Sequence, residues 1–556
     1  MMCKKYVIGV DFGSDSSRAV VVDAATGETV GSGEAFYTRW KKGLYQHPEL
    51  GVFRQHPLDY LEAIESCVTK ALQCLDQEEK SHVVGIGVDT TGSTPVPVDR
   101  EGTPLSLLKE FEENENAMFH LWKDHSAFAE AEEINEIFKN GSEIDYTKYQ
   151  GNYCAEWYWA KILHAVRADE RIREAAYTWE EHSDWMVGVL CGETRPEHIF
   201  HGACAAGHKA YWHSEWGGLP AAHVFEKLDP YLVLVRERYG RDPQPAVTMA
   251  GRLCPEWAQR LGLSTEVAVS GSSFDAHAGA VGAGIRENTM ICTMGTSAVD
   301  MIVEKAERLK GKNMKHFCGQ AEDSILPDMV GVETGQAAFG DIFAWFKKLL
   351  LWPLDAFKGK LDPEIYEEQY RTLDEQILID LQKAAEKLPD EPFPISLDWF
   401  NGRRYPDTDD FQRAFIGGLR LGMEPPYLYR ALVFGAICGM KRIVDGFEDQ
   451  EIQIHNVIAV GGISRKSEYV MQMMADVLGK KVAIVDALQT CALGAAIYAA
   501  VGSGVYATVD EAIRHMAAKE IYVFEPCMER NAFYRKHYED YLRLAEFADQ
   551  WKQHRV

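Results

Sequence analysis

The sequence lacks the features of several common protein classes. None of its 12 cysteines forms a C-x-x-C pair, so we expect no structural zinc site. No apolar run reaches about 18 residues without interruption, so we expect no membrane span. The N-terminus carries no secretory signal, and we therefore expect reduced thiols and a cytoplasmic protein.

Positive charge is also scarce. The formal net charge is −26, from 84 acidic and 58 basic side chains. Because a nucleic-acid partner normally requires a basic face, we expect none. Hydrophobic residues make up 46% of the 556 residues, which argues for packed cores and against disorder. A chain of this length should form two large domains, and we place them at residues 1–286 and 287–556.

The usual motifs of nucleotide binding are missing too. The chain has no G-x-x-x-x-G-K-[ST], so a P-loop is not supported. It has no G-x-G-x-x-G between a strand and a helix, which argues against a dinucleotide-binding fold. The chain also has no H-R-D, so it lacks the H-R-D and D-F-G set of protein kinases. Any nucleotide must therefore be held in another way.

Two segments in opposite halves of the chain share one pattern. Residues 6–23 and 289–303 each contain an apolar run, a turn with glycine followed by hydroxyl side chains, and a second apolar run. This pattern predicts a β-hairpin. Such a turn lets backbone N–H groups and hydroxyls converge on an anion, because glycine has no Cβ to block the approach. The pair therefore predicts two walls of one phosphate site.

The rest of each half follows a similar plan of helices and a strand that ends in a glycine-containing turn. Such strands are expected within residues 83–93 and 454–467, and another at residues 266–271. The apolar segment 428–444 predicts a buried helix. The charged segment 355–390 predicts a solvated helical excursion.

Asp11 and Arg18 flank the first turn, and each has two interpretations. The Asp11 carboxylate could hold Mg²⁺ or its waters beside a phosphate, or it could cap the turn through its own backbone. Arg18 could meet a phosphate oxygen or pair with a surface carboxylate.

Asp275 follows a strand and precedes the small-residue stretch 276–284, which suits the first turn of a buried helix. A carboxylate there could accept a hydroxyl proton as a general base. The alternative is an N-cap of that helix. His277 is expected to be a packed histidine rather than a catalytic one.

Four short motifs resemble the nucleotide-site motifs of the FGGY carbohydrate kinases. They lie at residues 11–18, 295–297, 461–464 and 492–496. Within that family the chain is similar to the bacterial L-ribulokinases over nearly its whole length. The stretches that carry this narrower resemblance are residues 88–95, 121–125, 206–209, 216–220, 253–258 and 398–404.

The resemblance implies a fold and an activity. The fold would be the α/β, actin/Hsp70-like (ribonuclease H-like) ATPase fold, with two lobes, mixed sheets flanked by helices, and the nucleotide in the cleft between the lobes. The activity would be the transfer of phosphate from ATP, with Mg²⁺, to the 5-hydroxyl of L-ribulose in L-arabinose catabolism.

The resemblance also implies roles for single residues. Asp275 would be the catalytic base and, with Asp11, would lie near Mg²⁺. The sugar would contact Lys209, Glu333 and Asp275, and the backbone near Val96. The residues that would surround ATP are Gly13, Ser14, Ser16, Ser17, Arg18, Gly295, Thr296, Ser297, Gly340, Gly461, Gly462 and Lys466.

Each sugar contact has a plain alternative. Lys209 lies in a loop rich in histidine and tryptophan and could be a surface charge. Glu333 lies between an apolar strand and a glycine turn, and could cap Gln336 or the backbone instead.

Other functions also stay open. The chain could be another FGGY kinase, acting on D-ribulose, xylulose or a pentitol, because pocket geometry separates these sugars and motifs do not. A more distant alternative is an actin-like ATPase that acts as a scaffold or chaperone. A small-molecule sugar is the expected partner, and a homodimer is left open.

Overall fold

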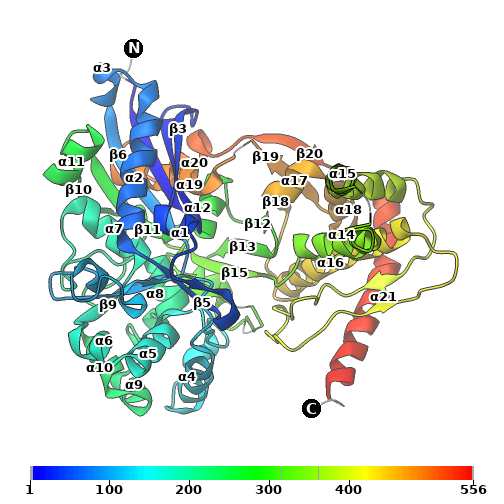
Figure 1. Ribbon diagram of the computed structural model, residues 1–556, viewed down its shortest axis with the longest axis horizontal. Coiled ribbons are helices and arrows are strands. Elements are labelled where there is room, and N and C mark those ends of the chain that lie inside the picture. The colour runs from blue at the N-terminus through cyan, green and yellow to red at the C-terminus, as the bar shows by residue number, and fades with distance from the viewer. Residues whose placement is uncertain (1–3, 315, 318, 361, 487, 554–556) are drawn as a thin grey trace.

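The structure is a computed structural model that describes residues 4–553 except 315, 318, 361 and 487. It contains two large mixed β-sheets, each flanked by helices (Figure 1). This arrangement agrees with the fold class predicted from the sequence. None of the helices in the described part of the chain combines the length and apolar character that a membrane crossing requires.

The first sheet has six strands in the order β10-β11-β6-β1-β2-β3. The hairpin β1–β2 and the pairs β2–β3 and β10–β11 are antiparallel, whereas β6 pairs in parallel with both β1 and β11. The central strand β1 is buried along its whole length, which explains its uninterrupted apolar sequence. The strands are β1 (Tyr6–Phe12), β2 (Ser16–Asp23), β3 (Thr29–Phe36), β6 (Val83–Thr90), β10 (Met249–Arg252) and β11 (Ala268–Phe274).

The second sheet repeats this order and adds one strand. Its order is β14-β15-β13-β12-β18-β19-β20, with an antiparallel hairpin β12–β13 and parallel pairs β12–β18 and β18–β19. Both predicted hairpins are therefore confirmed, and each lies at the centre of its own sheet. The strands are β12 (Thr289–Met294), β13 (Ala298–Glu304), β14 (Gln320–Glu322), β15 (Val330–Gln336), β18 (Asn456–Val460), β19 (Lys481–Val485) and β20 (Glu520–Phe524).

Helices of the first half cover the first sheet and form a separate aromatic-rich cluster. The helix α2 packs on β2 and β3, and α7 packs on β6 and β11. The helices α4, α5, α9 and α10 surround the separate cluster, which lies at the lower left of Figure 1. The helices are α1 (Thr38–Lys41), α2 (Pro57–Ala71), α3 (Gln77–Lys80), α4 (Phe128–Asn140), α5 (Tyr158–Ala168), α6 (Glu170–Ala175), α7 (His182–Cys191), α8 (Ala203–Ala210), α9 (Ala222–Leu228), α10 (Pro230–Glu237), α11 (Pro255–Leu261) and α12 (Asp275–Gly282).

Helices of the second half build the other core around one long buried helix, α16, as the apolar segment 428–444 predicts. The segment 355–390 is only partly a solvated excursion, because Tyr366, Leu381 and Ala385 are buried in it. The helices are α13 (Ala306–Leu309), α14 (Gly340–Asp355), α15 (Pro363–Glu386), α16 (Pro425–Asp449), α17 (Gly462–Lys466), α18 (Glu468–Leu478), α19 (Thr490–Gly502), α20 (Val509–Met516) and α21 (Met528–Gln553).

Short strands complete the structure away from the two large sheets. Three of them form a small sheet in the order β4-β5-β8, and the other four form two pairs. These strands are β4 (Gln46–His47), β5 (Val52–Gln55), β7 (Pro95–Val98), β8 (Phe119–His120), β9 (Thr178–Glu181), β16 (Ile395–Ser396) and β17 (Ile416–Gly417).

The helix α19 joins the two halves. It comes late in the chain, yet it returns to the first sheet, where it packs on β1, β6 and β11 and crosses α12 (Figure 1). The approach is close because small residues meet there. A Cβ added at Gly494 would lie 1.8 Å from the Ala278 carbonyl oxygen, and one at Gly9 would lie 1.7 Å from that of Ala492. Glycine is therefore required where α19 touches α12 and β1.

This contact gives a first testable prediction. In Gly494→Ala the new methyl group meets rigid backbone of α12, so we expect a loss of about 1–3 kcal/mol, as in other over-packed cores. Gly502→Ala is the matched control, because it lies in the same helix and its nearest contact would be 3.2 Å. Thermal unfolding should show a lower midpoint for Gly494→Ala only; equal midpoints for the two variants would contradict the close crossing.

Candidate active site

The first hairpin turn joins β1 to β2 and is held by many hydrogen bonds. Gly13 N donates to Ser16 O at 3.0 Å, which closes the turn. The hydroxyls of Ser16 and Ser17 are buried and already donate to Glu34 Oε1 and the Tyr37 hydroxyl oxygen. Gly13 and Ser14 are the more accessible part of the turn. Phosphate contacts at this turn therefore stay a prediction, with Gly13 and Ser14 best placed to make them.

The second turn, between β12 and β13, is fixed to the start of α14. Gly340 N donates to Gly295 O at 3.0 Å, and Asp341 N donates to Thr296 O at 3.1 Å. A Cβ added at Gly340 would lie 2.4 Å from Gly295 O, so this contact requires glycine. The first backbone N–H groups of α14 are therefore already paired with carbonyl oxygens of the turn, and phosphate contacts at residues 295–297 stay a prediction.

The predicted adenosine residues surround the same end of β12. Gly461 follows β18 with φ +103, and a Cβ there would lie 2.3 Å from Met294 O. Gly462 starts α17, and a Cβ there would meet open space. Lys466 ends the same short helix and is exposed. The structure thus brings the glycines of three separate segments to the second turn.

Three aspartates gather where β1, β6 and β11 end. Asp11 and Asp89 are paired directly across the parallel strands β1 and β6. Carboxylate oxygens of Asp11 and Asp89 and the Cys491 thiol of α19 all lie within 4.8 Å of one another. Asp275 begins α12 immediately after β11. The strand expected at residues 266–271 continues to Phe274, which brings Asp275 to the same end of the sheet as the other two.

Asp275 is not an N-cap of α12. Phe274 occupies the cap position, and Asp275 Oδ1 accepts a hydrogen bond from the next residue's backbone, Ala276 N, at 2.6 Å. Burial, and then the negative charge of Asp11, raises the pKa of Asp275 to about 7. A carboxyl group with this pKa can accept a proton near neutral pH and release it again.

Asp11 and Asp89 are more deeply buried. Asp11 lies 3.5 Å from Arg18 Nη1, and burial still raises its pKa above the usual range. Asp89 is 0% exposed, and neither of its oxygens has a hydrogen-bond partner among the described residues. Burial, and then the charges of Asp11 and Asp275, raises its pKa well above the usual range. Such a group of carboxylates is costly to bury without a cation or a proton.

In this structure Arg18 forms ion pairs with carboxylates. Its Nε also lies 3.1 Å from Glu34 Oε1, so it pairs with carboxylates on both sides of β2. A further contact with phosphate stays a prediction.

The predicted sugar residues Lys209 and Glu333 lie near the start of α12, close enough for their charges to act on Asp275. Lys209 is nearly buried, not a surface charge, and its ammonium lies 4.7 Å from the centre of the Trp157 ring. Glu333 Oε2 lies 3.5 Å from His277 Nε2, and among the described residues its carboxylate makes no hydrogen bond to Gln336 or to the backbone. Burial opposes ionisation of Glu333, but the positive charge of Lys209, followed by those of His277 and Arg404, lowers its pKa. Lys209 of the first half therefore lies close enough to Glu333 of the second half for its charge to lower the pKa of that carboxyl group.

The side chain of Val96 lies away from these charged residues. It belongs to β7, pairs with Glu180 of β9, and is fully buried in the core beneath the first sheet. Only its backbone remains for a sugar contact, as the sequence interpretation requires.

The matches with known proteins follow the two halves of this structure. Residues 6–203 match the N-terminal domain of the FGGY family of carbohydrate kinases, and residues 290–503 match its C-terminal domain. The chain belongs to the FGGY family. It is 42% identical to a ribulokinase of Vibrio parahaemolyticus over 98% of this chain and 96% of that protein. It is 33% identical to a ribulokinase of Halalkalibacterium halodurans over 98% of this chain and 95% of that protein.

Solved structures of the family share the fold at much lower identity. A xylulose kinase from Rhodospirillum rubrum has a TM-score of 0.78 at 18% identity, covering 98% of this chain and 99% of that one. A Plasmodium falciparum glycerol kinase solved with ADP has a TM-score of 0.76 at 17% identity, covering 98% of both chains. The two-lobed fold of FGGY kinases is thus confirmed for this chain.

Several residues of this site were not singled out from the sequence. Asp89 lies near the end of the strand expected within residues 83–93, and its parallel pairing with Asp11 marks it in the structure. Cys491 approaches the aspartates from α19, which no local pattern predicts. Trp122 is 37% exposed, and its Nε1 donates to Ser14 Oγ at 2.8 Å.

The pKa of Asp275 predicts the pH dependence of an FGGY kinase that uses it as a base. Its carboxylate must be ionised to accept a proton, so kcat/KM should fall as pH drops through about 7. Below that pH the fall should approach tenfold per unit. A pH profile of kcat/KM at fixed metal concentration measures this limb. A flat profile between pH 5 and 8 would contradict the role of Asp275.

Proposed function

We propose that this protein transfers the terminal phosphoryl group of ATP to the 5-hydroxyl of L-ribulose, giving L-ribulose 5-phosphate and ADP. The curated relatives named ribulokinase are similar to this chain over almost their whole length, which supports the choice of substrate. One observation carries the proposal. Glu333 from the second half contacts His277, two residues beyond Asp275, so the proposed sugar contacts and the proposed base belong to one site.

Asp275 would accept the proton of the attacking hydroxyl. Its pKa of about 7 suits this task, because a general base works best when its pKa lies near the working pH. Lys209 and Glu333 would hold the other hydroxyls of the sugar through an ammonium donor and a carboxylate acceptor. The remaining catalytic effect would come from positioning and from neutralising charge on the phosphates.

ATP would lie between the two hairpin turns. Gly13 and Ser14 would face its phosphates from the first sheet, and the turn at residues 295–297 would face them from the second. Gly340, Gly461, Gly462 and Lys466 would surround adenosine. Gly340 and Gly461 pack tightly against backbone at the end of β12, whereas a Cβ at Gly462 would meet open space.

Mg²⁺ would be held by Asp11 and Asp275, and we add Asp89 to this set. Mg²⁺ prefers oxygen ligands, and the buried, unpartnered oxygens of Asp89 fit a cation better than an empty core. The ion would neutralise charge on the phosphates during transfer. Asp11, Asp89 and Asp275 would fix the position of the ion.

A panel of sugars tests the proposal. Initial rates of ADP release should be measured with L-ribulose, D-ribulose, D-xylulose, L-xylulose, ribitol and arabinitol at fixed ATP and Mg²⁺. We expect the highest kcat/KM with L-ribulose and phosphorylation at its 5-hydroxyl. A higher kcat/KM with xylulose or with a pentitol would overturn the choice of substrate but keep the sugar kinase. ADP release independent of every sugar would favour an actin-like ATPase.

A further inference from the structure

We propose that His208, His277 and Glu333 form a binding site for a transition-metal ion such as Zn²⁺, separate from the carboxylates that would hold Mg²⁺. We further infer that an ion bound there excludes the sugar, and this second step rests on the proposed function because it needs Glu333 as a sugar contact. The site would make the enzyme sensitive to inhibition by Zn²⁺.

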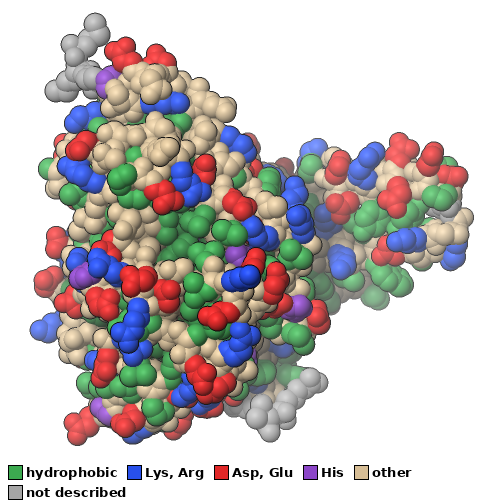
Figure 2. Space-filling model, turned by 60° about the vertical axis from the view of Figure 1, so that its left-hand side comes forward, with side chains coloured by type: hydrophobic (Ala, Val, Ile, Leu, Met, Phe, Trp, Pro, Cys, Tyr) green, Lys and Arg blue, Asp and Glu red, His purple; other side chains and the backbone are tan. Residues whose placement is uncertain are grey.

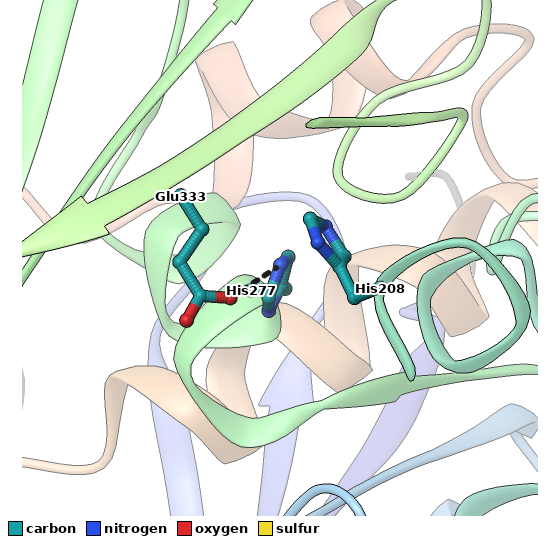
Figure 3. A group of neighbouring side chains, drawn as sticks. All are labelled: His208, His277 and Glu333. Atoms are coloured by element: carbon teal, nitrogen blue, oxygen red, sulfur yellow. Dashed lines mark ion pairs between the residues drawn. The ribbon is translucent and has the colours of Figure 1, made fainter. Parts of the chain in front are cut away.

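The three side chains come from different elements and point toward one another. His208 lies on α8, His277 on α12 and Glu333 on β15, and in Figure 3 the ring of His277 stands between the carboxylate and the ring of His208. One ligand atom from each lies within 4.8 Å of the others. Ligands of a tetrahedral zinc ion lie about 3.3 Å apart, so small side-chain rotations suffice to close the site.

Hydrogen bonds orient His208 for metal binding. Gln150 Nε2 donates to Gln320 O at 2.7 Å, which turns Gln150 Oε1 toward His208 Nδ1 at 3.3 Å. Since Oε1 can only accept, Nδ1 must carry the proton, and Nε2 keeps a free lone pair. That Nε2 is buried and has no hydrogen-bond partner among the described residues. A histidine whose second nitrogen donates to a fixed acceptor is the usual arrangement of a metal ligand.

His277 supplies a second buried donor. Its side chain is 2% exposed, and neither ring nitrogen has a hydrogen-bond partner in the described part of the chain. Its Nε2 lies on the side of Glu333, at 3.5 Å from the carboxylate. An imidazole buried in this way leaves a polar atom unsatisfied that a metal ion would satisfy.

The donor set favours zinc over magnesium. Two imidazoles and one carboxylate match the protein ligands of His₂Glu zinc sites, which keep a fourth position open. Imidazole nitrogen suits zinc and its neighbours in the series, whereas Mg²⁺ takes oxygen ligands. The set of Asp11, Asp89 and Asp275 has the opposite character. The molecule thus offers two neighbouring sites of different chemistry.

The positive charge of Lys209 should weaken the binding of a metal ion at this site, and this provides a test of the proposal. Its charge is the largest of those that lower the pKa of Glu333, so it would repel a cation bound to that carboxylate. Lys209→Met should therefore strengthen Zn²⁺ binding while it weakens sugar binding. A residue with a purely structural role would not move the two affinities in opposite directions.

Calorimetric titration of the full-length protein with ZnCl₂, without sugar or nucleotide, tests the site. The Cys491→Ser background removes the thiol of the other metal-capable cluster. We expect one ion per chain, lost in His208→Ala and weakened about 10–100-fold in Gln150→Leu, which keeps all three ligands. His223→Ala, an exposed histidine, is the matched control and should bind as the background does. Equal Zn²⁺ affinity in all four proteins would overturn the proposal.

Spectra and competition complete the test. Co²⁺ in place of Zn²⁺ should give the visible absorption of a four- or five-coordinate site, lost in His208→Ala; an octahedral spectrum unchanged by that substitution would overturn the assignment. L-Ribulose should raise the apparent Kd of Zn²⁺, and unchanged affinity would overturn the exclusion of sugar. If the wild type phosphorylated no sugar, the proposed function would fail, but the sugar-free titration would still decide the metal site.

Discussion

Asp275→Ala is expected to lower kcat for sugar phosphorylation by roughly 10²–10⁴-fold, the usual contribution of a general base. The carboxylate lies at the start of α12, and its pKa of about 7 allows it to take the hydroxyl proton at neutral pH. ATP affinity measured without Mg²⁺ should change little, because the turns proposed to hold the phosphates belong to other elements. Steady-state rates and equilibrium ATP binding measure the two effects separately.

Asp510→Ala is the matched control for this variant. It also removes an aspartate from the first turn of a helix, α20, but its side chain is exposed and lies outside the aspartate cluster. Its kcat should equal that of the wild type. Full activity in Asp275→Ala would contradict the mechanism, and a lost ATP affinity would show that the substitution damages the fold of the site.

Asp11→Asn is expected to lower kcat roughly 10²-fold or more, as the loss of one preorganised electrostatic contact does. It should also raise the Mg²⁺ concentration needed for half-maximal activity, because one of the proposed oxygen ligands loses its charge. A second effect follows because Asp11 also acts on Asp275. The charge of Asp11 helps to raise the pKa of Asp275, so its removal should shift the acidic limb of the pH profile to lower pH.

Asp300→Asn is the control for this second variant. Asp300 is a buried carboxylate of the other hairpin, and its raised pKa comes from burial, with Cys292 as its neighbour. Its substitution should leave the Mg²⁺ dependence and the acidic limb unchanged. An Asp11→Asn enzyme with wild-type Mg²⁺ dependence would contradict a metal-binding role for Asp11.

The charge balance of the surface agrees with a small-molecule enzyme. Figure 2 shows acidic and basic side chains interspersed over the visible face of the larger lobe. Because the net charge is −26, we expect an anionic ligand to be held by local groups such as the two hairpin turns, not by the overall field of the protein.

The local parts of this fold could be predicted from sequence. Both hairpins, the buried helix α16 and the helix that starts at Asp275 each follow from a run of neighbouring residues. Glycine followed by hydroxyl residues marks the turns, and small residues mark the helices that pack closely. The resemblance to a family added the roles of Lys209 and Glu333, which no local pattern gives.

The contacts between distant segments could not be predicted from sequence. Asp89 becomes a partner of Asp11 only through the parallel register of β6 and β1, although 78 positions of sequence separate the two. His208, His277 and Glu333 meet only when three elements are packed together. The packing of α19 on the first sheet depends on Gly494 and Gly9. Only the folded structure shows that no Cβ fits at these two positions. Long-range packing, not local propensity, decides these features.

The dependence of ADP release on L-ribulose tests the central claim most directly. With purified protein, ATP and Mg²⁺, we predict slow ADP release without sugar and a much faster release with L-ribulose, with one ADP formed for each sugar phosphorylated. ADP release at the same rate with and without L-ribulose would contradict a sugar kinase built from the two halves of this chain.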